Sequence, residues 1–185
     1  YGLLGSKAFM GEFKGFDNLL SRINFAINLE ARGTSGTQIM FETSADNYNT
    51  VKLFAEVNEN LFTCSTATMI YDMMPNGTDF SNLKPYYQGV NIANIGEGEN
   101  YHTPNDSPEN IRESCLSQQA QIVNNLIDKL ANYDLDSLYD AKENAIFFSY
   151  LNIGDVVYNH AFSVVLAVIG ILLLLSNIIV SVVSK

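Results

Sequence analysis

Positive charge is scarce in this sequence. Ten Lys and Arg residues stand against twenty Asp and Glu residues, which leaves a net charge of −10 at pH 7. No run of basic residues interrupts this acidic background. Because binding to DNA or RNA depends on Lys and Arg side chains that neutralise phosphates, the composition argues against a nucleic-acid partner.

Cysteine is rare as well. Cys64 and Cys115 could form one disulfide in an oxidising compartment or remain free buried thiols, and two cysteines are too few to define a disulfide framework. The sequence also lacks internal repeats and low-complexity linkers. Its 185 residues suffice for one compact domain with an appendage.

One stretch has no charge at all, from Ala161 to Val183. About 20 helical residues cross the hydrocarbon core of a bilayer, so the sequence predicts a membrane-spanning helix over residues 160–184 after a polar domain over residues 1–159. A buried core helix would be shorter and would show a polar face. The position excludes a signal peptide, and a glycolipid-anchor tail lacks its small-residue site and spacer.

Charges around this run predict its orientation. Lys185 is the only basic residue after it, whereas Glu143 and Asp155 precede it, which places the C-terminal tail in the cytoplasm. Residues 1–159 would then be lumenal or extracellular, in an integral membrane protein of the endomembrane system or the cell surface. The sequon at Asn76 could carry a glycan there.

Strand-like and helix-like patterns alternate before the apolar run. Strands are expected at 23–30, 38–43 and 87–95, and helices at 49–57 and 107–133. Ser107 and Pro108 give the second helix its predicted start. Residues 144–153 form either a further strand or a connector. The alternation predicts an α/β domain with a largely parallel sheet and a site at the carboxyl ends of its strands.

A few residues on this predicted edge could carry chemistry: Glu30 at a strand end, Asp79 in a turn, and Tyr101 and His102 in a loop before a helix. Carboxylate and imidazole groups are ligands that zinc accepts. Spacing alone does not show that they meet. Without further information, Glu30 could equally bond loop amides or Arg32, His102 could hydrogen-bond within its loop, and Tyr101 could simply pack.

Five blocks of the sequence resemble, in order, a family of zinc aminopeptidases. They read GLLGSKAF, INFAINLEARGTSG, IMFETS, NGTDF and NYHTPNDSPENI. They are similar to metallopeptidase family 28, and especially to its membrane-bound branch of endoplasmic reticulum metallopeptidases and vacuolar membrane proteases. The resemblance implies a three-layer αβα zinc-exopeptidase-like domain, here partial, and a peptide substrate.

The resemblance also implies a site. Members of the family hold two zinc ions with histidine and carboxylate ligands, while a glutamate acts as general base. On the matching positions, Glu30 and His102 would be zinc ligands and Tyr101 would contact the developing oxyanion. Asp79 and Arg32 fit family blocks without an assigned role.

In the family, the general base and the other ligands precede the block that resembles GLLGSKAF. We therefore expect this chain to be a fragment or subunit that is inactive alone and is completed by an upstream half, in the same polypeptide or in a separate chain. Two other functions stay open: an inactive peptidase-like ectodomain that serves as a structural or assembly subunit, and a one-zinc enzyme similar to glutaminyl cyclases. The block around His102 argues against loss of catalysis.

Overall fold

The structure, a computed structural model, describes residues 2–11, 17–58, 62–150 and 154–184. Its helices, 3-10 turns and strands are, in chain order, α1 (Leu4–Gly11), α2 (Asp17–Leu20), β1 (Phe25–Ala31), β2 (Ser35–Thr43), α3 (Tyr48–Val57), β3 (Phe62–Thr63), α4 (Ser65–Met73), α5 (Phe80–Leu83), β4 (Gln88–Gly96), η1 (Gly98–Asn100), η2 (Pro108–Asn110), α6 (Glu113–Leu130), η3 (Leu135–Tyr139), β5 (Ile146–Tyr150), β6 (Gly154–Tyr158) and α7 (His160–Val183).

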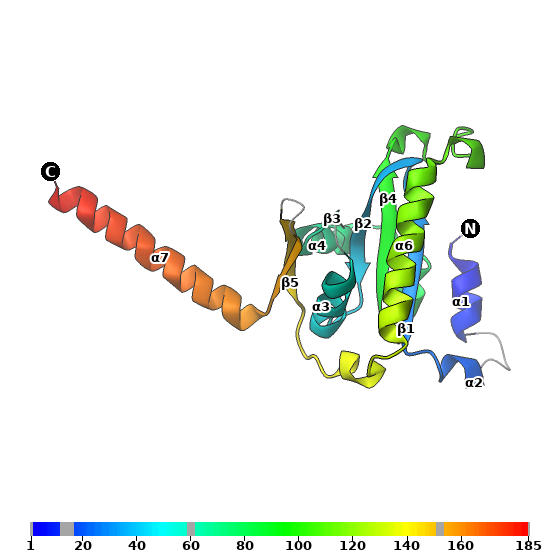
Figure 1. The fold of residues 1–185 in the computed structure, drawn as a ribbon, viewed down its shortest axis with the longest axis horizontal. Coiled ribbons are helices and arrows are strands. Elements are labelled where there is room, and N and C mark those ends of the chain that lie inside the picture. The colour runs from blue at the N-terminus through cyan, green and yellow to red at the C-terminus, as the bar shows by residue number, and fades with distance from the viewer. Residues whose placement is uncertain (1, 12–16, 59–61, 151–153, 185) are drawn as a thin grey trace.

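The central sheet has four strands in the order β1-β4-β2-β3 (Figure 1). β1 pairs with β4 and β2 with β3 in parallel, whereas β2 and β4 are antiparallel. The three predicted strands and the mostly parallel α/β sheet are therefore confirmed. β4 is buried over its first seven residues because helices pack on both faces of the sheet, and these residues include the polar Gln88, Asn91 and Asn94.

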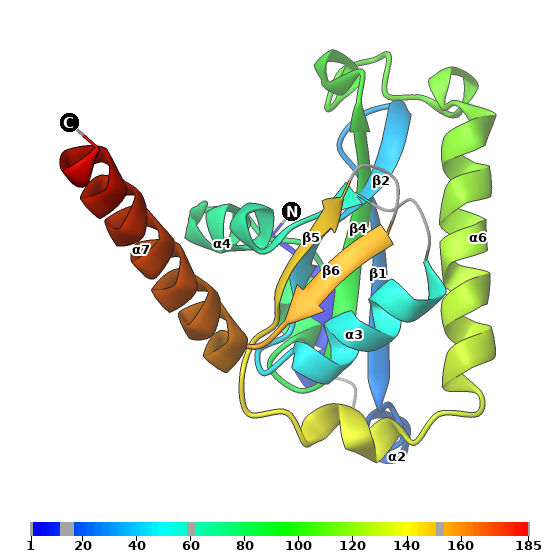
Figure 2. The ribbon, with the colours of Figure 1, turned by 60° about the vertical axis from the view of Figure 1, so that its left-hand side comes forward.

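Two apolar clusters hold the layers together. The larger one joins Met40, Val90 and Ile92 of the sheet to α3 and α6, whose Phe54 and Leu126 are buried. Figure 2 shows α6 running alongside these strands. The smaller cluster lies on the opposite face, where Phe80 of α5, Tyr87 and Ala26 form a core with Met10 of α1 packed against it. The result is a helix, sheet and helix arrangement.

β5 and β6 form an antiparallel hairpin that a bridge between Cys64 and Phe148 connects to the rest of the domain. β5 confirms a strand within the predicted segment 144–153, of which residues 151–153 lie outside the described part.

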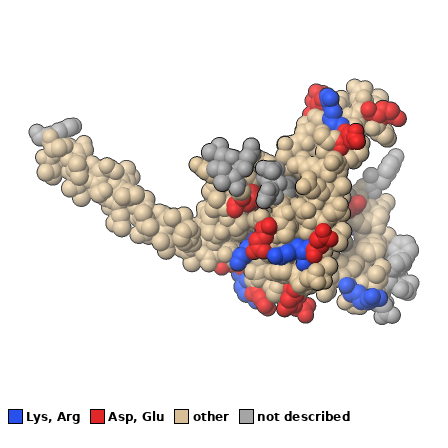
Figure 3. All heavy atoms as spheres, in the orientation of Figure 1, with Lys and Arg blue, Asp and Glu red and all other residues tan. Residues whose placement is uncertain are grey.

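α7 begins after the single residue Asn159 that follows the hairpin, and it leaves the domain at its edge (Figure 2). Its 24 residues are long and apolar enough to cross a membrane, and its most apolar stretch is 0% buried. Figure 3 shows no charged side chain along it in this view.

One predicted helix begins later than the sequence-based expectation. The helix predicted from Ser107 begins at Glu113, because Ile111 and Arg112 are extended and the backbone N–H of Arg112 donates to the carbonyl oxygen of Thr34 at 2.9 Å. Ser107 precedes only the short turn η2. The open question about the cysteines is also decided, since Cys64 and Cys115 are both free.

Candidate functional site

The carboxyl ends of β1 and β4 meet at one edge of the sheet. Because the two strands are parallel, Glu30, the second-last residue of β1, lies opposite Ala93 of β4. β4 then continues through η1 to Tyr101 and His102. The parallel pairing thus brings the predicted site residues of two distant segments to the same edge.

A cavity of about 360 Å³ opens at this edge. Glu30, Arg32 and Tyr101 contribute polar groups to it, together with Tyr71 of α4 and with Asn76 and Thr78 from the turn before α5. The remaining wall is largely apolar and comes from β2, β4 and α4, with Ile39, Phe41, Ile70, Met74 and Ile95 among its side chains. The arrangement suits a ligand with an apolar group and a polar end that faces Glu30.

Glu30 is half-buried and one of its oxygens is engaged. Its Oε1 accepts a hydrogen bond of 3.2 Å from Nδ2 of Asn28. Within the described ranges no hydrogen bond reaches its other oxygen and no ion pair joins it to Arg32. Arg32 instead lies 5.8 Å from the ring centroid of Tyr101, in cation–π contact. The expected partners of a purely structural Glu30 are therefore not the ones observed.

A chain of buried polar groups continues behind Glu30. Nδ2 of Asn28 also donates to Oδ1 of Asn91 at 2.9 Å, and Nδ2 of Asn91 donates to Oε2 of Glu42 at 2.8 Å. Glu42 is 1% exposed and Asn91 is 0% exposed. Nζ of Lys84 lies 2.7 Å from Oε1 of Glu42. Glu30 is thus connected, through two amide side chains, to an ion pair whose carboxylate is buried and whose ammonium is partly exposed.

Lys84 bridges this ion pair to the surface, because it also contacts Asp72 at 3.0 Å. Burial lowers the pKa of Lys84, but hydrogen bonds to Glu42 and Asp72 outweigh it and raise that pKa above its usual value. Sequence reasoning missed Asn28, Glu42 and Asn91. A partial signal was present, since Asn28 and Asn91 each lie between two apolar residues of a strand and Glu42 follows the apolar run 39–41.

Tyr101 and His102 occupy an exposed loop. Their rings stack with centroids 3.8 Å apart, and only Tyr101 lines the cavity. His102 has a φ of 60°, a left-handed conformation that is uncommon outside glycine, and its backbone N–H donates to Oδ2 of Asp106 at 3.3 Å. Its imidazole nitrogens make no hydrogen bond to any described residue. Asp79 precedes α5 without capping it through its side chain and does not line the cavity.

Glu97 connects the loop after β4 to the loop after β1 through hydrogen bonds. Its carboxylate accepts hydrogen bonds from Thr34 at 2.9 Å and from Arg112 at 2.8 Å. These bonds, that of Arg112 first, lower the pKa of Glu97 below its usual value. The loops approach so closely that a Cβ at Gly33 would collide with the carbonyl oxygen of Gly96. The contact holds the loop that leads to Tyr101 against the end of β1.

Comparison with known proteins decides the family. Residues 1–127 match the profile described as "Peptidase family M28". The chain belongs to peptidase family M28. The resemblance in the five sequence blocks is thereby confirmed, and the family supports a peptidase-type function.

Among curated proteins, this M28 chain is similar to "Endoplasmic reticulum metallopeptidase 1". It is 25% identical to the Homo sapiens protein over 144 residues, which are 75% of this chain and 16% of that protein. It is 26% identical to the Mus musculus protein over 144 residues, 75% of this chain and 16% of that protein. The Rattus norvegicus protein is 26% identical over 119 residues, 62% of this chain and 13% of that protein. The chain thus spans a small part of these relatives. No solved structure matches it.

Members of the M28 family are generally zinc-dependent, so the donors at this edge can be compared with what zinc requires. The carboxylate of Glu30 and the imidazole of His102 are suitable in kind, and each keeps ligating atoms without a partner among the described residues. They are insufficient in number, because the described part of the chain holds no group of three or more His, Cys, Asp or Glu residues placed for a metal. Two donors match the family's chemistry but do not complete a site.

Proposed function

We propose that this chain is part of a membrane-anchored, zinc-dependent exopeptidase that removes N-terminal residues from peptides. One observation carries the proposal: in an M28 chain, Glu30 stands at the carboxyl end of a parallel strand, borders a cavity of about 360 Å³ and keeps one carboxylate oxygen without a hydrogen bond from described residues. This is the position at which α/β proteins bind ligands.

In this proposal Glu30 and His102 are zinc ligands. Asn28 fixes one oxygen of Glu30 and leaves the other for the metal. Zinc, expected as two ions, would polarise the scissile carbonyl and lower the pKa of a bound water. The phenol of Tyr101, which lines the same cavity, would donate a hydrogen bond to the oxygen that develops negative charge. The other ligands and the general base would come from residues outside the printed sequence.

The proposal includes a location. α7 would cross the membrane and residues 1–159 would lie on the lumenal or extracellular side, where they meet peptide substrates. Asn76 is exposed and begins the sequon, so it is accessible to a glycan. A shift in electrophoretic mobility after deglycosylation, lost in Asn76→Gln, would support this orientation. A glycan-free protein whose globular part resists labelling from the lumenal side would contradict it.

The alternative function is that of a peptidase-like subunit that serves in assembly rather than catalysis. The two functions differ in a measurable way, because the assembly subunit would bind no zinc when its complete protein is isolated.

The first experiment therefore measures zinc content and aminopeptidase activity on the complete protein that contains this chain. We expect about two zinc ions per chain, by the family's chemistry, and cleavage of aminoacyl peptides that a chelator abolishes. Glu30→Gln and His102→Ala should each lower the zinc content, whereas Glu99→Gln, which replaces an exposed carboxylate outside the cavity that holds Glu30, should not. Full zinc content in both ligand variants would refute their role, and neither zinc nor cleavage in the unmodified protein would favour the assembly subunit.

A further inference from the structure

One face of the β5–β6 hairpin is apolar and uncovered. The register pairs Ile146 with Tyr158, Phe148 with Val156 and Tyr150 with Gly154, and paired residues at alternate positions lie on the same side of a hairpin. We call these six residues the hairpin face. The hairpin face carries no charge. It is nevertheless open to its surroundings, because Phe148, Tyr150 and Val156 are 37%, 51% and 39% exposed.

The opposite side of the hairpin shows the reverse pattern. Phe147 is 2% exposed and joins the large apolar cluster, and Val157 packs against that cluster. The hairpin's one carboxylate, Asp155, also lies on this inner side, where Oγ of Ser149 donates to it at 2.6 Å. A hairpin with one face in water would place its charge outward and its aromatic residues inward. The apolar composition of the hairpin face therefore indicates an environment other than water.

The hairpin face continues directly into α7. Asn159 is the one residue between β6 and α7, and its Oδ1 accepts a hydrogen bond of 2.9 Å from the backbone N–H of Phe162. The backbone N–H of His160 donates to Glu143 at 3.3 Å, and the rings of Tyr158 and Phe162 meet edge to face with centroids 5.7 Å apart. These contacts set the direction in which α7 leaves the hairpin.

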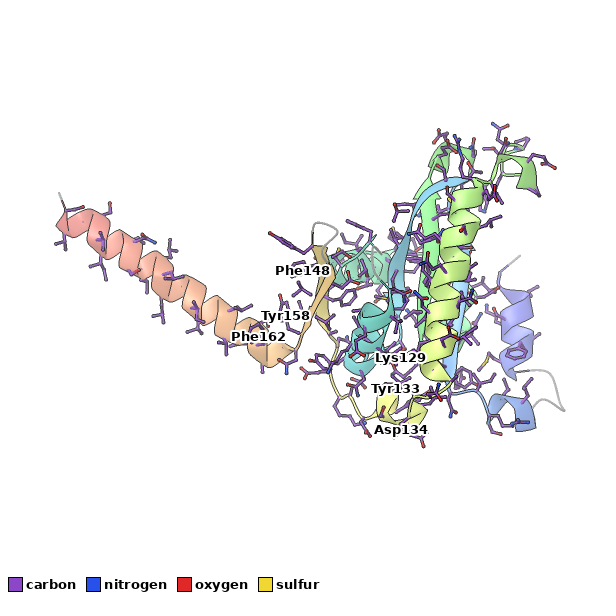
Figure 4. The ribbon with its side chains drawn as sticks, viewed as in Figure 1. Lys129, Tyr133, Asp134, Phe148, Tyr158 and Phe162 are labelled. Atoms are coloured by element: carbon purple, nitrogen blue, oxygen red, sulfur yellow. The ribbon has the colours of Figure 1, made fainter. Side chains whose placement is uncertain are left out.

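The figures place the aromatic residues on the side of the membrane helix. Figure 4 shows Phe148, Tyr158 and Phe162 in succession along the edge of the domain from which α7 extends. Because α7 begins at His160, the surface of a bilayer crossed by α7 would lie close to this junction and toward the hairpin face.

We propose that the hairpin face rests in the interfacial layer of the bilayer that α7 crosses. Tyrosine and phenylalanine suit this layer because their rings are apolar while the tyrosine hydroxyl reaches water and headgroups. The face contains no Lys or Arg, so its contact with lipid depends on apolar burial and not on anionic headgroups. The hairpin thereby orients the globular domain on the membrane, whatever reaction that domain performs.

Photocrosslinking on the complete protein in its membrane tests this. Phe148 or Tyr150 is replaced by p-benzoylphenylalanine, which keeps an aromatic ring at an exposed position and forms adducts with neighbouring C–H groups. The same replacement at Phe162, 50% exposed on α7, is the lipid-facing control. Replacement at Tyr86, 66% exposed on the globular domain, is the control outside the hairpin.

We expect mass spectrometry to find lipid adducts at positions 148, 150 and 162 and none at position 86. After reconstitution in phosphatidylcholine vesicles, the yield at 148 and 150 should not change with added phosphatidylserine or salt. Adducts to protein at 148 and 150 would overturn the proposal and show that another polypeptide segment covers the hairpin face. Lipid adducts at 162 alone would overturn it as well, because the face would then be in water.

Discussion

The two faces of the central sheet are built from the same strands but from different chemistry. On one face Met40, Val90 and Ile92 pack against α3 and α6 in a cluster without a charged side chain. On the other, Asn28, Asn91 and Glu42 form the buried polar chain that reaches Glu30. The first arrangement gains stability from burial of apolar area. The second buries polar and charged groups, which costs stability, and it fixes a carboxylate at the edge of a cavity.

The substitution expected to destabilise the apolar face most is Phe54→Ala. Phe54 is 1% exposed in α3 and belongs to the large cluster. Its removal should lower the free energy of unfolding by about 3–5 kcal/mol, the range for Phe→Ala in a packed core. Chemical denaturation followed by circular dichroism measures this. Leu116→Ala on α6, 54% exposed, is the control and should change it by less than about 0.5 kcal/mol. Equal losses would mean that this face is not the stabilising one.

On the polar face the largest effect is expected from Lys84→Met. It keeps the aliphatic chain but leaves Glu42, 1% exposed, without its cation. Breaking a fully buried pair costs about 3–5 kcal/mol, and because the Lys84 side chain is 30% exposed we expect about 2 kcal/mol. Denaturation at neutral pH measures this loss. The raised pKa of Lys84 means that the pair's contribution is complete below the usual 10.5 and is lost as pH rises through the higher folded value.

The double variant Glu42→Gln with Lys84→Met separates charge from packing. If the cost of Lys84→Met arises from an unpaired carboxylate, neutralising that carboxylate should restore part of the lost stability. A double variant less stable than Lys84→Met would show that Glu42 contributes mainly through the hydrogen bonds that it accepts from Asn91 at 2.8 Å and Thr78 at 3.4 Å.

The sequence predicted the apolar face better than the polar one. The strands at 23–30, 38–43 and 87–95 stood out because buried strands are rich in apolar residues whatever their partners are. Strict alternation in IMFET would place Glu42 on the same face as Met40. A register shift between Met40 and Glu42 instead brings Glu42 opposite Asn91 on the polar face. Such a bulge depends on the partner strand and leaves no local signal.

The candidate site was predictable in the same uneven way. Glu30 reached the expected edge because parallel strands end together, which follows from the order of strands and helices alone. The stacking of His102 on Tyr101 joins two neighbouring residues, whereas the junction of Glu97 with Arg112 and Thr34 is a contact between separate segments. The contact of Arg112 with Thr34 also displaces the start of α6, which the capping pattern at Ser107 had placed too early.

A smaller change sharpens the link between the polar face and Glu30. Asn28→Ala removes the hydrogen bond to Glu30 and the one to Asn91, so stability should fall by about 1 kcal/mol. If Glu30 binds zinc, the affinity should also fall by about tenfold, the lower end for loss of a group that orients a ligand. Zinc titration of the complete protein measures this.

Asn82→Ala is the matched control for this variant. It deletes a side-chain hydrogen bond of 2.7 Å, to Ser6, that does not involve the polar chain. A similar loss of stability with unchanged zinc affinity is expected. Reduced zinc affinity in both variants would show that Asn28 acts only through the general stability of the fold.

The smallest expected effect concerns Asp155, the one carboxylate in the strands of the β5–β6 hairpin, on the side that packs against the large apolar cluster. Burial raises the pKa of Asp155 above its usual value, and the hydrogen bond from Ser149 lowers it only in part. Its Oδ2 is buried and accepts no hydrogen bond from the residues that the structure describes. Because the folded state holds this proton more tightly than the unfolded state, the free energy of unfolding falls as pH rises from the usual 3.8 through the raised folded value.

Asp155→Asn keeps an acceptor for Ser149 and removes the buried charge. At neutral pH it should therefore stabilise the fold by up to about 1 kcal/mol, a limit set by partial exposure. The difference between the two proteins should vanish at acidic pH, and Asp128→Asn on the exposed side of α6 should not reproduce it. If the difference in the free energy of unfolding between the two proteins were the same at every pH, Asp155 would be solvated in the folded state. The inner side of the hairpin would then not be part of the apolar packing around the large cluster.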